Sequence, residues 1–162
     1  VGGGVSYRPV ERLLVALEGQ WSQWSETQDV LEANYDDAFW AQQMDACDGD
    51  ELKLHWEDQL QIRLGLEYML TNRFAVRLGT YTDPAPGPDE TQTILIPNTD
   101  FTVIAGGVGY NADRWAVDLA FEYLMGDDRE IAADEVLQGV GMYGTHGLDI
   151  LVASIAFTYN FR

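Results

Sequence analysis

Apolar and polar residues alternate along most of this 162-residue chain, and this period of two constrains its fold more than any other feature. From Leu60 to Leu70, every second residue is apolar or aromatic, whereas the residues between them include Gln61, Arg63 and Glu67. The same alternation runs through residues 13–21, 74–79, 115–123 and 151–161. Side chains point alternately to the two faces of a β-strand, so each segment predicts a strand with one apolar face and one polar face.

The strands are joined by connections that alternate between short and long. We predict seven antiparallel strands, over residues 3–8, 12–25, 53–70, 74–83, 101–111, 115–126 and 146–161. The three long connections are residues 26–52, 84–100 and 127–145. Short periplasmic turns alternating with long extracellular loops are typical of outer-membrane barrels. No stretch reaches ~18 consecutive apolar residues, which excludes a membrane-spanning helix. The prediction is therefore an all-β, antiparallel transmembrane β-barrel occupying residues 1–162, in the bacterial outer membrane.

Six charged residues of the predicted strands lie on the polar faces. A cation on the lipid face near the bilayer midplane costs about 2–4 kcal/mol, and an acid less, so the polar face is predicted to be the lumen. Arg63 and Arg77 have two open interpretations. They bind the carboxylate of a ligand through charge-assisted hydrogen bonds, or they pair with acids of neighbouring strands in a structural network. The candidate lumenal residues are Glu18, Arg63, Glu67, Arg77, Asp118 and Glu122.

The distribution of charge supports the orientation of the barrel. The long connection 26–52 holds nine acids and neither Arg nor Lys. Five arginines accompany the short turns and the C-terminus, which is therefore predicted to be periplasmic: Arg8, Arg12, Arg73, Arg114 and Arg162. The net charge of −18 argues against a nucleic-acid partner, because phosphate binding needs clustered cations.

Seven strands do not close a barrel in the usual way. Bacterial single-chain barrels have even strand numbers. An open sheet also leaves two unpaired edges that nothing in hydrocarbon can satisfy. We therefore expect the remaining wall to come from a segment before Val1 or from a second chain.

Seven segments carry recognisable motifs: Gly4–Pro9, Trp21–Ser25, Leu60–Tyr68, Asn72–Gly79, the proline loop Asp83–Glu90, Asp113–Tyr123 and the terminal Ala156–Phe161. In this order they resemble FadL-type long-chain fatty-acid transporters of the outer membrane. The resemblance implies a 14-stranded barrel with an N-terminal plug, of which this chain is the C-terminal half with the last seven strands. It also implies passive uptake of long-chain fatty acids or other hydrophobic molecules, without a cofactor. The outer-membrane lipids, including lipopolysaccharide, would be its surroundings.

Two loops carry further candidates. Prolines fix their own backbone and keep the preceding residue extended, so Asp83, Pro84, Pro86 and Pro88 predict a stiff loop at the extracellular mouth. Carboxylates in the long acidic loop offer a weak calcium site, against the simpler reading of a solvated acidic loop. That candidate set is Asp45, Asp48, Asp50 and Glu51.

Enzymatic chemistry has little support in the sequence. A single cysteine, Cys47, and two distant histidines, His55 and His146, give no zinc cluster. Three alternatives to a transporter stay open. A soluble lipocalin-like barrel would have a polar exterior and an apolar interior. A purely structural outer-membrane barrel would share the alternation without uptake. A membrane-embedded hydrolase would need His55 and His146.

Overall fold

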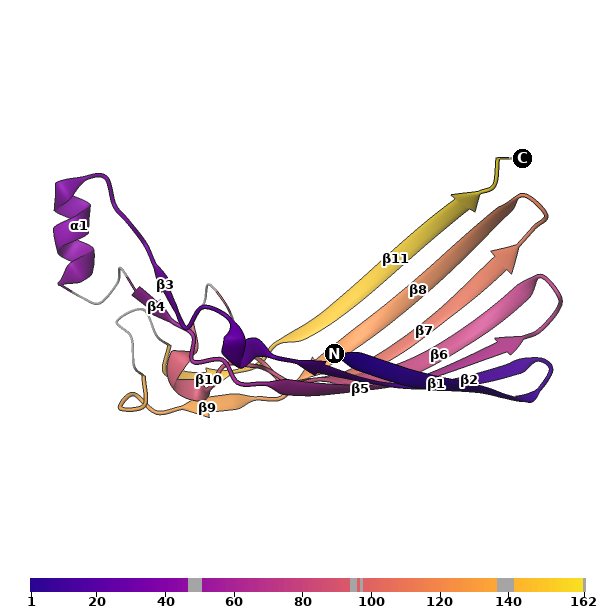
Figure 1. The fold of residues 1–162 in the computed structure, drawn as a ribbon, viewed down its shortest axis with the longest axis horizontal. Coiled ribbons are helices and arrows are strands. Elements are labelled where there is room, and N and C mark those ends of the chain that lie inside the picture. Colours follow the sequence, from indigo (N-terminus) through magenta and orange to yellow (C-terminus); the bar gives the residue numbers. More distant parts are fainter. Residues whose placement is uncertain (47–50, 94–95, 97, 137–141, 162) are drawn as a thin grey trace.

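Seven long strands form one antiparallel sheet in which neighbours in sequence are neighbours in space (Figure 1). The computed structural model describes residues 1–46, 51–93, 96, 98–136 and 142–161. The sheet order is β1-β2-β5-β6-β7-β8-β11. With 9 to 12 residues each, the strands have about the length that a tilted membrane strand needs. Their bounds are β1 Gly2–Val10, β2 Leu13–Ser22, β5 Gln59–Met69, β6 Phe74–Asp83, β7 Phe101–Asn111, β8 Trp115–Gly126 and β11 Asp149–Tyr159.

Short turns gather at one end of this sheet and long connections at the other (Figure 1). We call these the turn end and the loop end; the C-terminus lies at the turn end. Within the described residues, β1 and β11 each pair with one neighbour, so the sheet is a piece of barrel wall and is not closed. The predicted all-β antiparallel fold is confirmed.

The long connections hold more structure than the sequence indicates. Strands β3 (Val30–Glu32) and β4 (Glu51–Lys53) form one ribbon, and β9 (Arg129–Ile131) and β10 (Gly144–His146) form another. Helix α1 (Ala38–Asp45) is capped by Asp37, whose carboxylate accepts hydrogen bonds from the N–H groups of Phe39 and Trp40. Two 3-10 turns, η1 (Trp24–Glu26) and η2 (Asp89–Thr91), complete the set. No helix among the described residues has the length and hydropathy to cross a membrane.

Three predicted strands are too long. The strand predicted over 12–25 ends at Ser22, because η1 turns the chain away. The strand predicted over 53–70 starts at Gln59 in the main sheet, since His55 adopts a left-handed backbone with φ of 45°. The strand predicted over 146–161 spans Asp149–Tyr159, and His146 belongs to the β9–β10 ribbon.

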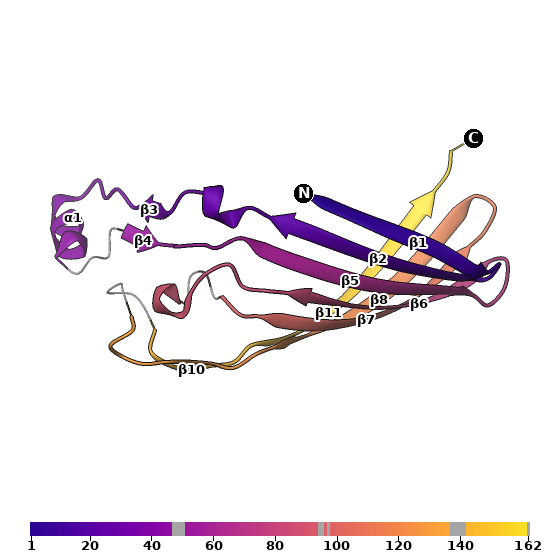
Figure 2. The ribbon, with the colours of Figure 1, turned by 60° about the horizontal axis from the view of Figure 1, so that its bottom comes forward.

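The register of the sheet separates an apolar face from a polar face. Leu78, Phe121 and Leu151 on the apolar face are 59%, 58% and 74% exposed. On the opposite face, Arg77 of β6 reaches Asp118 of β8 across the intervening β7. The sheet curls (Figure 2), and contacts across a whole strand fit a curve toward the polar face. This arrangement is the reverse of the lipocalin-like alternative.

The most buried residues of the described chain lie mainly at the loop end. Leu54, Thr91, Thr93 and Ile131 are at most 6% exposed. The Thr91 hydroxyl donates to the Leu54 carbonyl at 3.1 Å, and the Glu57 N–H donates to the Pro86 carbonyl at 2.8 Å. The segment 84–93 is therefore packed between its neighbouring connections.

Candidate lumenal site

Two groups of charged residues lie on the polar face, one nearer each end of the sheet. Nearer the loop end, Glu18 of β2 and Arg63 of β5 are register partners. Arg63 Nη1 donates to Glu18 Oε1 at 3.0 Å, and Arg63 Nη2 donates to the amide oxygen of Gln61. The guanidinium carbon also lies 6.0 Å from the ring centroid of Tyr81. Arg63 therefore has one carboxylate partner within the described chain.

Nearer the turn end, Arg77 is held between two carboxylates. Its Nε donates to Glu67 Oε2 at 2.8 Å, and its Nη1 donates to Asp118 Oδ1 at 2.6 Å. This triad spans β5, β6 and β8 and passes over Gly109 of β7. A Cβ on Gly109 would lie 2.5 Å from Asp118 Oδ1 and 2.8 Å from Arg77 Nη1. The triad can therefore take this position because residue 109 has no side chain.

The structure pairs the predicted residues in part as the network interpretation requires. Glu122 differs, because it accepts a 3.5 Å hydrogen bond from the Tyr81 hydroxyl instead of contacting an arginine. Gln61 donates to Asp83 Oδ1 at 2.7 Å, which ties β5 to the last residue of β6. Gln61 and Tyr81 were not among the predicted lumenal residues. Both residues have odd numbers, like the charged residues of β5 and β6. This shared face was the signal that could have identified them from the sequence.

A band of small residues, which we call the belt, runs between the two charged groups. Ala16, Gly65, Gly79 and Ala105 are successive register partners on β2, β5, β6 and β7. A Cβ added at Gly65 would meet nothing within 4 Å. The polar face is thus recessed between the Arg63 row and the Arg77 row. A small hollow of about 230 Å³ adjoins the Arg77 triad on its turn-end side.

The proline loop begins where β6 ends, at Asp83. Its prolines are half-buried, and Pro88 has an extended backbone with φ −71° and ψ 165°. Arg129 fastens this loop from β9. Its Nε lies 2.7 Å from Asp89 Oδ1, and its Nη atoms donate to the carbonyls of Gly87 and Asn98.

A second fastening joins the connections beside β2 and β5. Asp58 accepts hydrogen bonds from the Ser25 hydroxyl at 2.6 Å and from the Ser25 N–H at 3.0 Å. These bonds favour the charged carboxylate, so they hold the pKa of Asp58 below its ordinary value.

The remaining candidates do not form a common site among the described residues. His55 lies 3.4 Å from Glu90, whereas His146 belongs to β10 and its Nε2 is buried without a partner. Asp45 ends α1 and Glu51 begins β4; Asp48, Asp50 and Cys47 lie outside the described residues. Within the described ranges, no three His, Cys, Asp or Glu side chains gather as metal ligands.

Comparisons with known proteins agree with this architecture. No curated protein shows significant similarity to the chain. Among solved structures, a Pseudomonas aeruginosa FadL homologue matches with a TM-score of 0.72 at 18% identity. The match covers 99% of this chain and 35% of that protein, so the chain spans about a third of its length. The family model for outer membrane transport proteins of the OMPP1/FadL/TodX type matches residues 3–161. The chain therefore belongs to the OMPP1/FadL/TodX family of outer membrane transport proteins.

Proposed function

We propose that the chain forms part of the wall of a passive channel for long-chain fatty acids or other hydrophobic molecules. The observation that carries this proposal is the sheet with two unlike faces: apolar side chains outside, and a polar inner face with a recessed belt. Family membership supports the same function. In this arrangement the hydrophobic part of a ligand lies against the belt formed by Ala16, Gly65, Gly79 and Ala105.

Within this channel, Arg63 is the residue that we assign to a ligand carboxylate. Arg77 already contacts two carboxylates, whereas Glu18 is the one carboxylate that Arg63 contacts among the described residues. A guanidinium has five N–H donors, so Arg63 retains donors for a carboxylate beside the bonds that it makes to Glu18 and Gln61. Arg77 is then the structural member of the pair, and Glu67 and Asp118 hold it in place.

The test compares a charged ligand with a neutral one. Uptake of a long-chain fatty acid and of its methyl ester is measured in vesicles that contain the complete folded protein. Arg63→Gln is expected to lower fatty-acid uptake by about tenfold, the scale of one charge-assisted hydrogen bond in a half-exposed site, and to spare the ester. Equal losses for both ligands would contradict the assignment of Arg63.

The same experiment separates a transporter from a structural barrel. A structural barrel predicts uptake no faster than that of protein-free vesicles, for both ligands and for all variants. Uptake that saturates with ligand concentration in the unmodified protein supports the channel. Lipid hydrolysis products in the vesicles, lost in His55→Ala and His146→Ala, would favour the hydrolase alternative instead.

For the membrane orientation, we propose that the loop end faces the cell exterior and the turn end the periplasm. The acidic connections then meet the lipopolysaccharide surface, and the fastened proline loop shapes the mouth. The exposed edges of β1 and β11 then pair with the rest of the wall, from the same chain or another. Protease cleavage within residues 26–52 on intact cells tests this orientation; cleavage restricted to opened cells would reverse it.

A further inference from the structure

The turn end differs sharply in charge from the rest of the chain. Arg12, Arg73 and Arg114 lie in the three successive short turns, and Arg8 lies beside the first. Glu11 and Asp113 are the acids in these turns. A chain with a net charge of −18 therefore carries an excess of positive charge at this end. A partner at this surface is expected to be anionic.

The turn arginines are fixed in one repeated way. The carbonyls of Arg12, Arg73 and Arg114 each accept an N–H of the following hairpin at 2.8 Å, from Met69, Asn111 and Asn160. The arginines therefore form a row along the rim, with one guanidinium for each turn.

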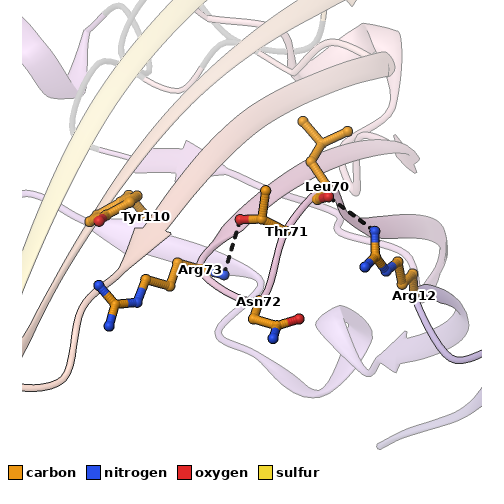
Figure 3. A pocket seen from close by; sticks show the side chains of 6 residues that line it. All are labelled: Arg12, Leu70, Thr71, Asn72, Arg73 and Tyr110. Carbon is orange, nitrogen blue, oxygen red and sulfur yellow. Dashed lines mark hydrogen bonds between the residues drawn. The ribbon is translucent and has the colours of Figure 1, made fainter.

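A shallow hollow of about 580 Å³ lies between the first two members of this row (Figure 3). Arg12 Nη1 donates to the Leu70 carbonyl at 3.2 Å, and the Thr71 hydroxyl accepts the Arg73 N–H at 3.2 Å. Arg12 has no carboxylate partner among the described residues, so most of its N–H donors face solvent. Arg73 contacts the highly exposed Asp113 at 3.2 Å. The lining residues are Arg12, Leu70, Thr71, Asn72, Arg73 and Tyr110.

The hollow lies where the apolar outer face ends. Leu70 and Tyr110 continue the outward rows of β5 and β7 and are 46% and 38% exposed. Tyr110 also packs against Trp115 with ring centroids 5.4 Å apart. Tyr and Trp side chains are enriched at the boundary between hydrocarbon and headgroups. The two guanidiniums therefore lie at headgroup depth, next to a surface that contacts acyl chains.

We propose that this hollow binds the phosphate of an anionic phospholipid in the leaflet that meets the turn end. Arg12 donates to the phosphate oxygens, and the acyl chains lie along Leu70 and Tyr110. The Arg73 guanidinium extends away from Arg12 and pairs with Asp113 of the next turn, so it contributes positive charge to the rim and no direct contact with this phosphate (Figure 3). Free phosphate offers the Arg12 guanidinium the same oxygens, but it leaves the adjoining apolar surface without a partner. The inference rests on the proposed membrane orientation and extends it to a specific lipid class.

The experiment measures lipids retained by the complete folded protein, purified from mixed micelles of phosphatidylglycerol and phosphatidylcholine, by native mass spectrometry. The unmodified protein is expected to retain phosphatidylglycerol preferentially. A basic residue near an anionic surface changes binding by roughly fivefold, so the double variant Arg12→Gln/Arg73→Gln is expected to lose about thirtyfold. The single variant Arg12→Gln is expected to lose about fivefold. Arg114→Gln removes one charge from the same rim outside the hollow and is expected to keep the preference.

Several outcomes overturn the proposal. They are equal retention by the double variant and the unmodified protein, and a loss in Arg114→Gln equal to that of Arg12→Gln. Complete displacement by millimolar inorganic phosphate would identify an anion site without lipid specificity. In a second set of micelles that also contains lipopolysaccharide, preferential retention of lipopolysaccharide would place the turn end at the outer leaflet. If the double variant does not fold, the unmodified protein must still lose phosphatidylglycerol as sodium chloride rises. Retention does not depend on uptake, so failure here is distinguishable from failure of the channel.

Discussion

The triad that crosses β7 makes a quantitative prediction for Gly109→Ala. The new methyl group would occupy the space of Asp118 Oδ1 and Arg77 Nη1, which lie 2.5 and 2.8 Å from its position. Both atoms are ends of flexible side chains, so they move aside and the backbone stays in place. The expected cost is the loss of the two ion pairs that Arg77 makes with Asp118 and Glu67.

The magnitude follows from exposure. The Arg77, Glu67 and Asp118 side chains keep 45%, 25% and 41% of their surface. Ion pairs this exposed contribute about 0.2–1 kcal/mol each. Displacing both should therefore lower the free energy of unfolding by about 0.5–2 kcal/mol. Because an exposed pair is screened by salt, the loss should shrink in 1 M sodium chloride.

The assay is urea unfolding of the complete protein in lipid vesicles, followed by tryptophan fluorescence. Gly65→Ala is the matched control, since it lies on the same face with nothing within 4 Å of the added methyl. It removes a strand glycine without a collision, so the difference between the two variants isolates the triad. Gly107→Ala should cost more than Gly109→Ala, because its methyl would lie 2.8 Å from the Leu119 backbone carbonyl, which cannot rotate away.

A double-mutant cycle shows whether the penalty of Gly109→Ala comes from the triad. In an Asp118→Ala background, the added methyl at residue 109 has lost its main obstacle. The penalty of Gly109→Ala relative to Gly65→Ala should then fall below about 0.5 kcal/mol, the usual limit of non-additivity for independent sites. An undiminished penalty would refute the argument that the triad needs the glycine.

Three further predictions concern the two faces and the loop end. Phe121→Arg should lower the free energy of unfolding of the protein in a bilayer by about 2–4 kcal/mol, and Ala120→Arg on the other face should lower it by much less. Equilibrium unfolding in vesicles measures both values, and equal costs would argue against the assigned faces. Arg129→Lys should expose the proline loop to limited proteolysis without unfolding the barrel, because one ammonium cannot replace a planar fork with several acceptors; an unchanged digestion pattern would argue against the fastening. Because the pKa of Asp58 is lowered, its contact with Ser25 stabilises the folded protein fully above the ordinary carboxyl pKa, and this stabilisation is lost as pH falls through the lowered value. Carboxyl NMR should show a higher pKa of Asp58 in Ser25→Ala, and an unchanged pKa would contradict the role of this contact.

Much of the fold was predictable because strand alternation is a local property of the sequence. Once Arg63 and Glu67 are placed on one face of β5, the partners of that face follow from the pleat alone. The register also followed from the short turns, which leave a hairpin little freedom. The six charged residues therefore share one face of the sheet, and their place in a lumen stays a prediction.

The contacts of these residues were less predictable, because they depend on curvature and on side chains of non-adjacent strands. Arg77 reaches Asp118 only because β7 carries Gly109 between them. Glu122 and Tyr81 meet across the same strand, and the sequence offers no local sign of this contact.

The loop end was the least predictable region. Arg129 binds carbonyls of Gly87 and Asn98, which are 42 and 31 residues away along the chain. Backbone carbonyls carry no signature of residue type, so such a contact leaves no pattern in the sequence. The β3–β4 and β9–β10 ribbons are three residues per strand, too short for alternation to stand out.

The central claim, that the apolar face meets lipid and the charged face lines an aqueous lumen, is tested most directly by cysteine labelling along β8. Single cysteines are placed at Leu119, Ala120, Phe121 and Glu122 in a Cys47→Ser background, and the complete protein is assembled in membranes. We predict that a water-soluble thiol reagent modifies positions 120 and 122, while 119 and 121 react only with a reagent dissolved in the bilayer. Uniform labelling by the water-soluble reagent, or the opposite alternation, would contradict the account.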